Sequence, residues 1–184
     1  MKPVMYVQDF LQAQFTRSLD STGTGYMMRS KDYVETGGIP GKYPNLIFAD
    51  FELWVRLISK NYLAVSPEKS FHYRVHKSTS TLTNGDAYQK AFEYYVLFLK
   101  NASEKYSQIS NTIDSYFQPW LYFMCEHLSH RLLKTPKEKR QISVQEFIEK
   151  CKDFAHLLIP EKEFVPRKIF RIWVAALLDK NQLG

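Results

Sequence analysis

Residues 49–58 of the chain have the sequence ADFELWVRLI and form the clearest helical pattern in its first half. Apolar side chains recur there at the i, i+3, i+4, i+7 spacing of one helix face: Phe51, Trp54, Val55 and Ile58. Asp50 is a residue type favoured at the N-cap, and Asn61 interrupts the pattern. The sequence therefore predicts a short amphipathic helix that starts at Asp50 and ends before Asn61.

Turn signals are frequent on both sides of this helix, so we expect the elements of residues 1–84 to be short. Residues 26–29 are predicted as a strand, residues 32–36 as a short helix ended by Gly37, and residues 71–75 as an alternating strand. Two or three strands without a βαβ unit are too few for a complete doubly wound sheet. This part is therefore predicted to be an α/β fragment.

Residues 85–184 have a helical period almost throughout. Four apolar stripes follow one another, over residues 88–99, 113–128, 144–158 and 169–178. Asp86, the capping box Ser143–Glu146 and Pro166 mark helix starts, while Pro119 either kinks the second helix or marks its first turn. We expect these helices to form a small bundle. The predicted chain is mostly helical, with residues 1–84 as one domain and residues 85–184 as a helical extension.

The composition is that of a globular protein, with 45 % hydrophobic and 24 % charged residues among 184, which argues against a disordered or fibrous chain. The net charge of +6 is divided evenly between the two halves, so neither is a basic arm and no nucleic-acid partner is expected. Two cysteines, Cys125 and Cys151, have no metal-binding spacing. We expect both to be buried, free thiols in a cytoplasmic protein.

The sequence contains no apolar run of 18 residues, so neither a spanning helix nor a signal peptide is predicted. Near the carboxyl end, basic and large apolar residues are mixed: Lys162, Phe164, Arg167, Lys168, Ile169, Phe170, Arg171 and Trp173. This pattern suits a helix packed on its own domain, and it also suits one that rests on a membrane surface. Both interpretations remain open, and with the second the protein would lie at the inner face of the membrane.

Four sequence elements that contain candidate functional residues follow one another between Gly25 and Ser80. They are a strand ending in Met28-Arg29, the sequence YVETGGIP of residues 33–40, the helix starting ADFELW, and the sequence FHYRVHKSTS of residues 71–80. In this order they resemble the carboxy-terminal half of the catalytic domain of family 2 glycosyltransferases, which have the GT-A fold. That family has an arginine-bearing strand, a Gly-Gly turn, a helix opened by a Glu-Asp-x-Asp-Leu-Trp-like motif and a Tyr-Arg-x-His-x-x-Ser-like strand.

The resemblance implies a role for several residues. Asp50 would be the base that takes a proton from the acceptor hydroxyl. Arg74 and His76 would face the donor diphosphate or its metal, with His76 as a candidate metal ligand; strand alternation places residues 72, 74 and 76 on one face. The acceptor side would include Gly37, Gly38, Glu52 and Trp54. The structural alternatives are that Asp50 is only a helix cap and that Arg74 and His76 belong to an exposed polar strand face.

The sequence also departs from the family pattern. Ala49 stands where the family usually has glutamate, and Glu52 where it often has aspartate. The family's amino-terminal half supplies nucleotide-binding strands and an Asp-x-Asp metal site, and no Asp-x-Asp occurs here. The resemblance therefore implies that the chain is the carboxy-terminal part of a longer enzyme. The complete enzyme would need Mg²⁺ or Mn²⁺, and this fragment alone would bind a nucleotide sugar poorly.

The function expected from the resemblance is a bacterial-type glycosyltransferase of cell-surface polysaccharide synthesis. It would transfer a sugar, with inversion, from a nucleotide-sugar donor to a hydroxyl of a glycan or lipid-linked acceptor. The helices after residue 84 would cover the catalytic half, form a homodimer contact or approach the membrane. The alternative is a non-catalytic helical protein-interaction module, in which the aromatic stripes form the surface for a partner.

Overall fold

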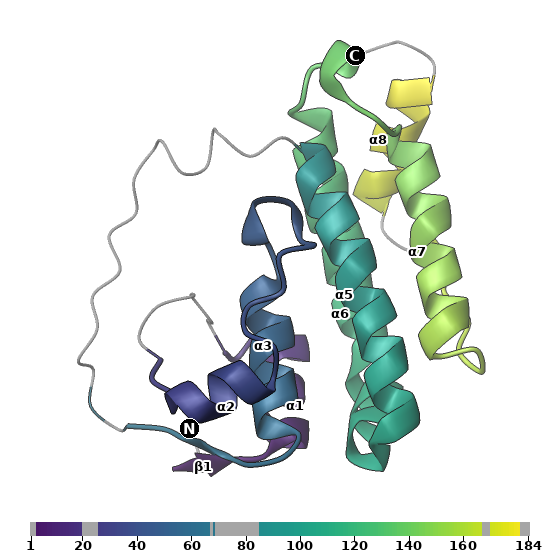
Figure 1. Cartoon of the computed structure of the whole chain (residues 1–184). Helices are drawn as coiled ribbons and strands as arrows, with labels where there is room; N and C mark the ends of the chain where they lie inside the picture. Colours follow the sequence, from purple (N-terminus) through teal and green to yellow (C-terminus); the bar gives the residue numbers. More distant parts are fainter. Residues whose placement is uncertain (1–2, 20–25, 67, 69–84, 167–169, 181–184) are drawn as a thin grey trace.

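The computed structural model of the chain describes residues 3–19, 26–66, 68, 85–166 and 170–180. These residues are mostly helical, as the sequence predicts, with a small two-stranded sheet (Figure 1). The helices are α1 (Val7–Phe15), α2 (Ser30–Glu35), α3 (Ala49–Ile58), α5 (Gly85–Lys105), α6 (Ser107–Leu133), α7 (Val144–Leu158) and α8 (Phe170–Lys180). Two short 3₁₀ turns, η1 (Pro44–Leu46) and η2 (Lys137–Lys139), lie in the connections between them.

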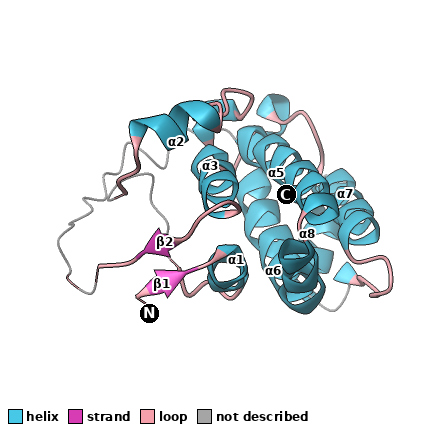
Figure 2. Cartoon of the chain, turned by 60° about the horizontal axis from the view of Figure 1, so that its bottom comes forward, coloured by secondary structure: helices cyan, strands magenta, loops and turns pink. Residues whose placement is uncertain are grey.

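The sheet consists of β1 (Val4–Met5) and β2 (Leu63–Ala64), which pair antiparallel with Val4 opposite Ala64. Figure 2 shows it beside α1, on the side of the molecule away from α7. Residues 26–29, which were expected to form a strand, are irregular, so that prediction is wrong. The ring of Tyr26 packs instead on the ring of Trp54, with the centroids 4.2 Å apart. The predicted strand at residues 71–75 lies outside the described residues.

The helical region is a bundle in which α6 contacts α5, α7 and α8. The apolar stripes predicted for α5, α6 and α7 are largely buried, and Cys125 and Cys151 are buried and free, as expected. The predicted capping box begins α7, where the Glu146 backbone N–H donates to the Ser143 hydroxyl over 3.1 Å. Pro119 lies exposed in the middle of α6, so it does not mark a first turn.

One hydrophobic core contains residues from both parts of the chain, before and after residue 84. Helix α1 packs along α6, where the Phe15 ring lies 5.0 Å from Trp120 and 5.7 Å from Phe117. The Phe48 ring, just before α3, stacks on Tyr95 of α5 with the centroids 5.4 Å apart. Because aromatic pairs bury large areas, these contacts fix α1 and α3 on the bundle.

Two helices differ from the sequence-based expectation in detail. Helix α3 begins at Ala49 with Phe48 as its N-cap, so Asp50 is not the cap but lies in the first turn. Helix α8 buries Ile172 and Ala176, whereas its predicted core residues are exposed or half-buried: Phe170, Trp173, Val174, Leu177 and Leu178. The rotation of α8 is fixed by Asp179, whose buried carboxylate pairs with Arg140.

Candidate functional site

Arg56 of α3 joins two of the elements that carry the resemblance. Its Nη1 donates to the Thr36 carbonyl oxygen over 2.5 Å, and its Nη2 donates to the Gly38 carbonyl oxygen over 2.8 Å. These carbonyls belong to the turn that follows α2. The guanidinium thus fixes the Gly-Gly turn against α3 through charge-assisted hydrogen bonds.

The turn itself requires glycine. Gly37 and Gly38 have φ angles of 79° and 66°, in the left-handed region. The Gly38 backbone N–H donates to the Tyr33 carbonyl oxygen over 2.9 Å, which closes the end of α2. A Cβ at Gly38 would lie 3.0 Å from the Tyr33 ring, which is closer than side chains normally approach. The prediction that Gly37 ends this helix is confirmed.

We expect Gly38→Ala to lower the free energy of unfolding by about 1–3 kcal/mol. Alanine is strained at the left-handed φ angle of this position, and its Cβ would also lie too close to the Tyr33 ring. Gly41→Ala is the matched control, since a Cβ at Gly41 meets nothing within 4 Å. Equilibrium unfolding in urea measures both variants. Equal stability of the two would show that the Gly-Gly turn is not constrained in this way.

Glu52 occupies a buried position beside the same turn, with 5 % of its surface exposed. Its carboxylate accepts a hydrogen bond from the Tyr43 hydroxyl and pairs with Lys42 Nζ at 3.0 Å. Arg56 Nε lies 3.7 Å from the other carboxylate oxygen. Burial and the Glu52 carboxylate both raise the pKa of Tyr43, so its hydroxyl stays protonated as a donor.

The environment of Asp50 is different. It is half-buried, and one carboxylate oxygen accepts a hydrogen bond from the Phe51 backbone N–H over 2.9 Å. Within the described part of the chain this carboxylate makes no ion pair. Burial raises the pKa of Asp50 above its ordinary value, although the backbone hydrogen bond from Phe51 opposes the effect. A carboxylate of this kind is a stronger base than one held in an ion pair.

The structure divides the residues expected on the acceptor side. Gly37, Gly38 and Glu52 lie together around Arg56. Residues 50 and 52 are about 200° apart around α3, so Asp50 lies away from this group. Trp54 lines a third region, a cavity of about 450 Å³ shared with Met28, Arg29 and Tyr62. Arg74 and His76 lie outside the described residues.

A cavity of about 390 Å³ opens beside the Arg56 group. It is lined by residues from α3 and α5, among them Glu52, Arg56, Asn101 and Lys105. Arg56, Tyr43 and Lys42 were not predicted as site residues, although the spacing of four residues between Glu52 and Arg56 is the usual signal of an ion pair on a helix. The Glu52 carboxylate is thus paired with Lys42 and with Arg56, the residue that holds the turn.

The expected divalent metal is not matched by the residues that the structure describes. These contain no group of three or more His, Cys, Asp or Glu side chains that could hold an ion. The candidate ligand His76 lies outside the described ranges.

Comparisons with known proteins find no match to this chain: no family model, no curated protein and no solved structure matches it. The resemblance to family 2 glycosyltransferases thus depends on residues 25–80 alone.

Proposed function

We propose that this chain is the carboxy-terminal part of a family 2 glycosyltransferase with the GT-A fold. The enzyme transfers a sugar from a nucleotide-sugar donor to a hydroxyl of a glycan or lipid-linked acceptor. The observation that supports this most is the packing of the Gly37-Gly38 turn against the Asp50 helix through Arg56. Two elements that carry the resemblance thereby form one structural unit instead of separate fragments.

The contrast between the two acidic residues in the first turn of α3 supports the choice of base. Glu52 is neutralised by Lys42 and Arg56 and is committed to the fold. Asp50 has a raised pKa and no ion pair among the described residues. Neighbouring carboxylates in unlike environments commonly divide structural and acid–base roles. Asp50 is therefore the group that we assign to proton abstraction.

In the proposed reaction the acceptor oxygen forms a bond to the anomeric carbon of the donor sugar, while the bond from that carbon to the nucleoside diphosphate breaks. The hydroxyl proton passes to the Asp50 carboxylate. Arg74 and His76 provide positive charge or hydrogen bonds for the departing diphosphate. The Gly37-Gly38 turn borders the path of the acceptor. Mg²⁺ or Mn²⁺, if the complete enzyme uses it, would add charge at the diphosphate.

The test is release of nucleoside diphosphate by the protein in its native polypeptide, with a panel of uridine, guanosine and thymidine diphospho-sugars. We expect turnover with one donor class, and a loss of about 10²–10³-fold in kcat/KM for Arg74→Gln, because the diphosphate loses a cationic partner. Lys77→Gln is the matched control, since it removes one positive charge at a position to which the resemblance assigns no role. Absence of donor-dependent release, or equal activity of the two variants, would contradict the proposal.

A further inference from the structure

Helix α8 has an apolar face that points away from the bundle. Its exposed fractions are 70 % for Phe170, 45 % for Trp173, 46 % for Leu177 and 41 % for Leu178. At 100° per residue, Phe170 and Leu177 are about 160° and 140° from the buried Ile172 around the helix. The outward side of the helix thus carries the large side chains, and the inward side carries the small or aliphatic ones.

This orientation is held by a buried ion pair. Arg140 Nη1 lies 2.6 Å from Asp179 Oδ1, and the other carboxylate oxygen accepts a hydrogen bond from the Val144 backbone N–H over 3.2 Å. Figure 1 shows α8 alongside α6 and α7, the two helices that it contacts. The ion pair and this hydrogen bond hold α8 in the orientation that leaves its apolar face exposed.

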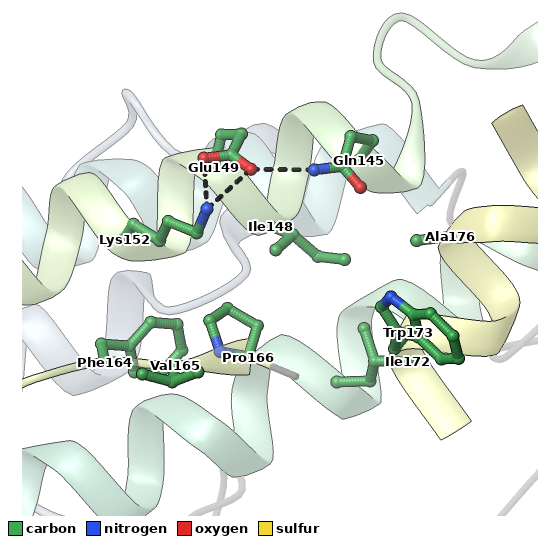
Figure 3. Close-up of a pocket in the computed structure, with 10 residues that line it drawn as sticks. All are labelled: Gln145, Ile148, Glu149, Lys152, Phe164, Val165, Pro166, Ile172, Trp173 and Ala176. Atoms are coloured by element: carbon green, nitrogen blue, oxygen red, sulfur yellow. Dashed lines mark hydrogen bonds and ion pairs between the residues drawn. The ribbon is translucent and has the colours of Figure 1, made fainter. Parts of the chain in front are cut away.

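The apolar surface continues from α8 into a groove against α7. Figure 3 shows this groove, a cavity of about 350 Å³ whose lining includes Ile148, Phe164, Ile172 and Trp173. Its polar edge is on α7, where Lys152 Nζ pairs with Glu149 at 2.7 Å. Trp173 lies at the border between the groove and the outward face. The exposed aromatic ring is therefore part of a larger apolar surface.

Among the described residues, a basic side chain of α8 borders this surface. Arg171 is exposed on α8, next to the outward face. Asp179, the acidic residue of α8, is buried and already paired with Arg140. The whole chain has a net charge of +6. An apolar helix face bordered by an arginine, on a chain of positive net charge, is complementary to a membrane surface with apolar acyl chains beneath negatively charged headgroups.

We propose that α8 binds the surface of an anionic phospholipid membrane, with its axis in the membrane plane. Phe170, Trp173 and Leu177 would enter the boundary between headgroups and acyl chains, and Arg171 would contact lipid phosphates. Among the described residues, no helix has the length and hydropathy of a membrane-spanning segment. This inference is independent of sugar transfer, because it can be tested without turnover.

A second copy of the chain fits this face less well. A stable protein interface uses about 20–30 residues on each side. The outward face of α8 offers only a few side chains, and pairing two such faces would bring together two Arg171 residues and two chains of charge +6. A lipid surface has neither disadvantage, because it is continuous and carries the opposite charge.

Tryptophan fluorescence offers a direct test, because Trp54 and Trp120 are 5 % and 4 % exposed whereas Trp173 is 45 % exposed. We expect vesicles with about one third phosphatidylglycerol in phosphatidylcholine to shift the emission to shorter wavelength, and pure phosphatidylcholine vesicles to have little effect. The double variant Phe170→Ser, Leu177→Ser should lower vesicle partitioning about tenfold or more in co-sedimentation. Its melting temperature should stay close to that of the wild type, since both side chains are exposed.

Leu97→Ser on α5 is the matched control, because Leu97 is also 45 % exposed, and it should bind vesicles normally. The proposal is overturned if anionic vesicles leave the Trp173 emission unchanged, or if both lipid compositions bind equally. It is also overturned if the double variant binds as well as Leu97→Ser, or if sedimentation equilibrium shows a dimer that the double variant dissociates.

Discussion

Arg140→Gln should lower the free energy of unfolding by about 3–5 kcal/mol, because it leaves the buried Asp179 carboxylate without its partner. The two side chains are only 8 % and 6 % exposed. Arg140 also donates from Nε to the Thr135 carbonyl oxygen over 2.7 Å and from Nη2 to the Leu133 carbonyl oxygen over 3.1 Å. One side chain thus joins α8 to the end of α6. Equilibrium unfolding in guanidinium chloride measures the loss.

Lys152→Gln provides the control for this variant. Lys152 pairs with Glu149 at 2.7 Å, but both side chains are about half exposed, so its removal should cost less than about 1 kcal/mol. The double variant Arg140→Gln, Asp179→Asn should recover part of the lost stability, since it removes the unpaired charge. A single Arg140→Gln variant as stable as Lys152→Gln would contradict the role assigned to the buried pair.

Local sequence signals predicted the helical bundle well. The capping box at Ser143 and the apolar stripes of α5, α6 and α7 depend on residues three or four positions apart, which meet on one helix face. Such patterns need no knowledge of the tertiary fold. The short helix α2 and its end at Gly37 were also predictable, because a left-handed residue after a helix favours glycine.

The features that the sequence did not predict depend on distant partners. The rotation of α8 follows from an ion pair between residues 39 positions apart, and periodicity alone cannot choose between two apolar faces. Residues 26–29 are irregular, and Tyr26 packs on Trp54 of a helix further along the chain. Asp50 and Glu52 are close in sequence, yet their positions on α3 give them unlike surroundings. The roles of Arg74 and His76 stay predictions, since the described residues do not include them.

Asp50→Asn should lower kcat for sugar transfer by about 10²–10⁴-fold while KM for the donor changes little, because the amide cannot accept the hydroxyl proton. The same variant should be at least as stable as the wild type at neutral pH. Burial raises the folded-state pKa of Asp50 above its unfolded-state pKa. The free energy of unfolding therefore decreases as the pH rises from the unfolded-state pKa through the folded-state pKa, where this carboxyl ionises. Replacement by a neutral amide removes this cost.

Asp153→Asn is the matched control for this change. Asp153 is an exposed carboxylate on α7, so its amide variant has the same loss of charge without a change near α3. Circular dichroism and urea unfolding should show both variants folded. A rate difference between them then reports on chemistry, because both variants are folded and have the same net charge.

The most direct measurement is kcat for transfer to acceptor by Asp50→Asn relative to Asp153→Asn, in the native polypeptide, over the pH range in which the wild type is active. With Asp50 as the base, the ratio is about 10⁻² or lower and the acidic limb of the wild-type pH profile disappears in Asp50→Asn. A ratio near one, with both variants keeping the wild-type pH profile, would contradict the assignment of Asp50 as the base of a glycosyltransferase.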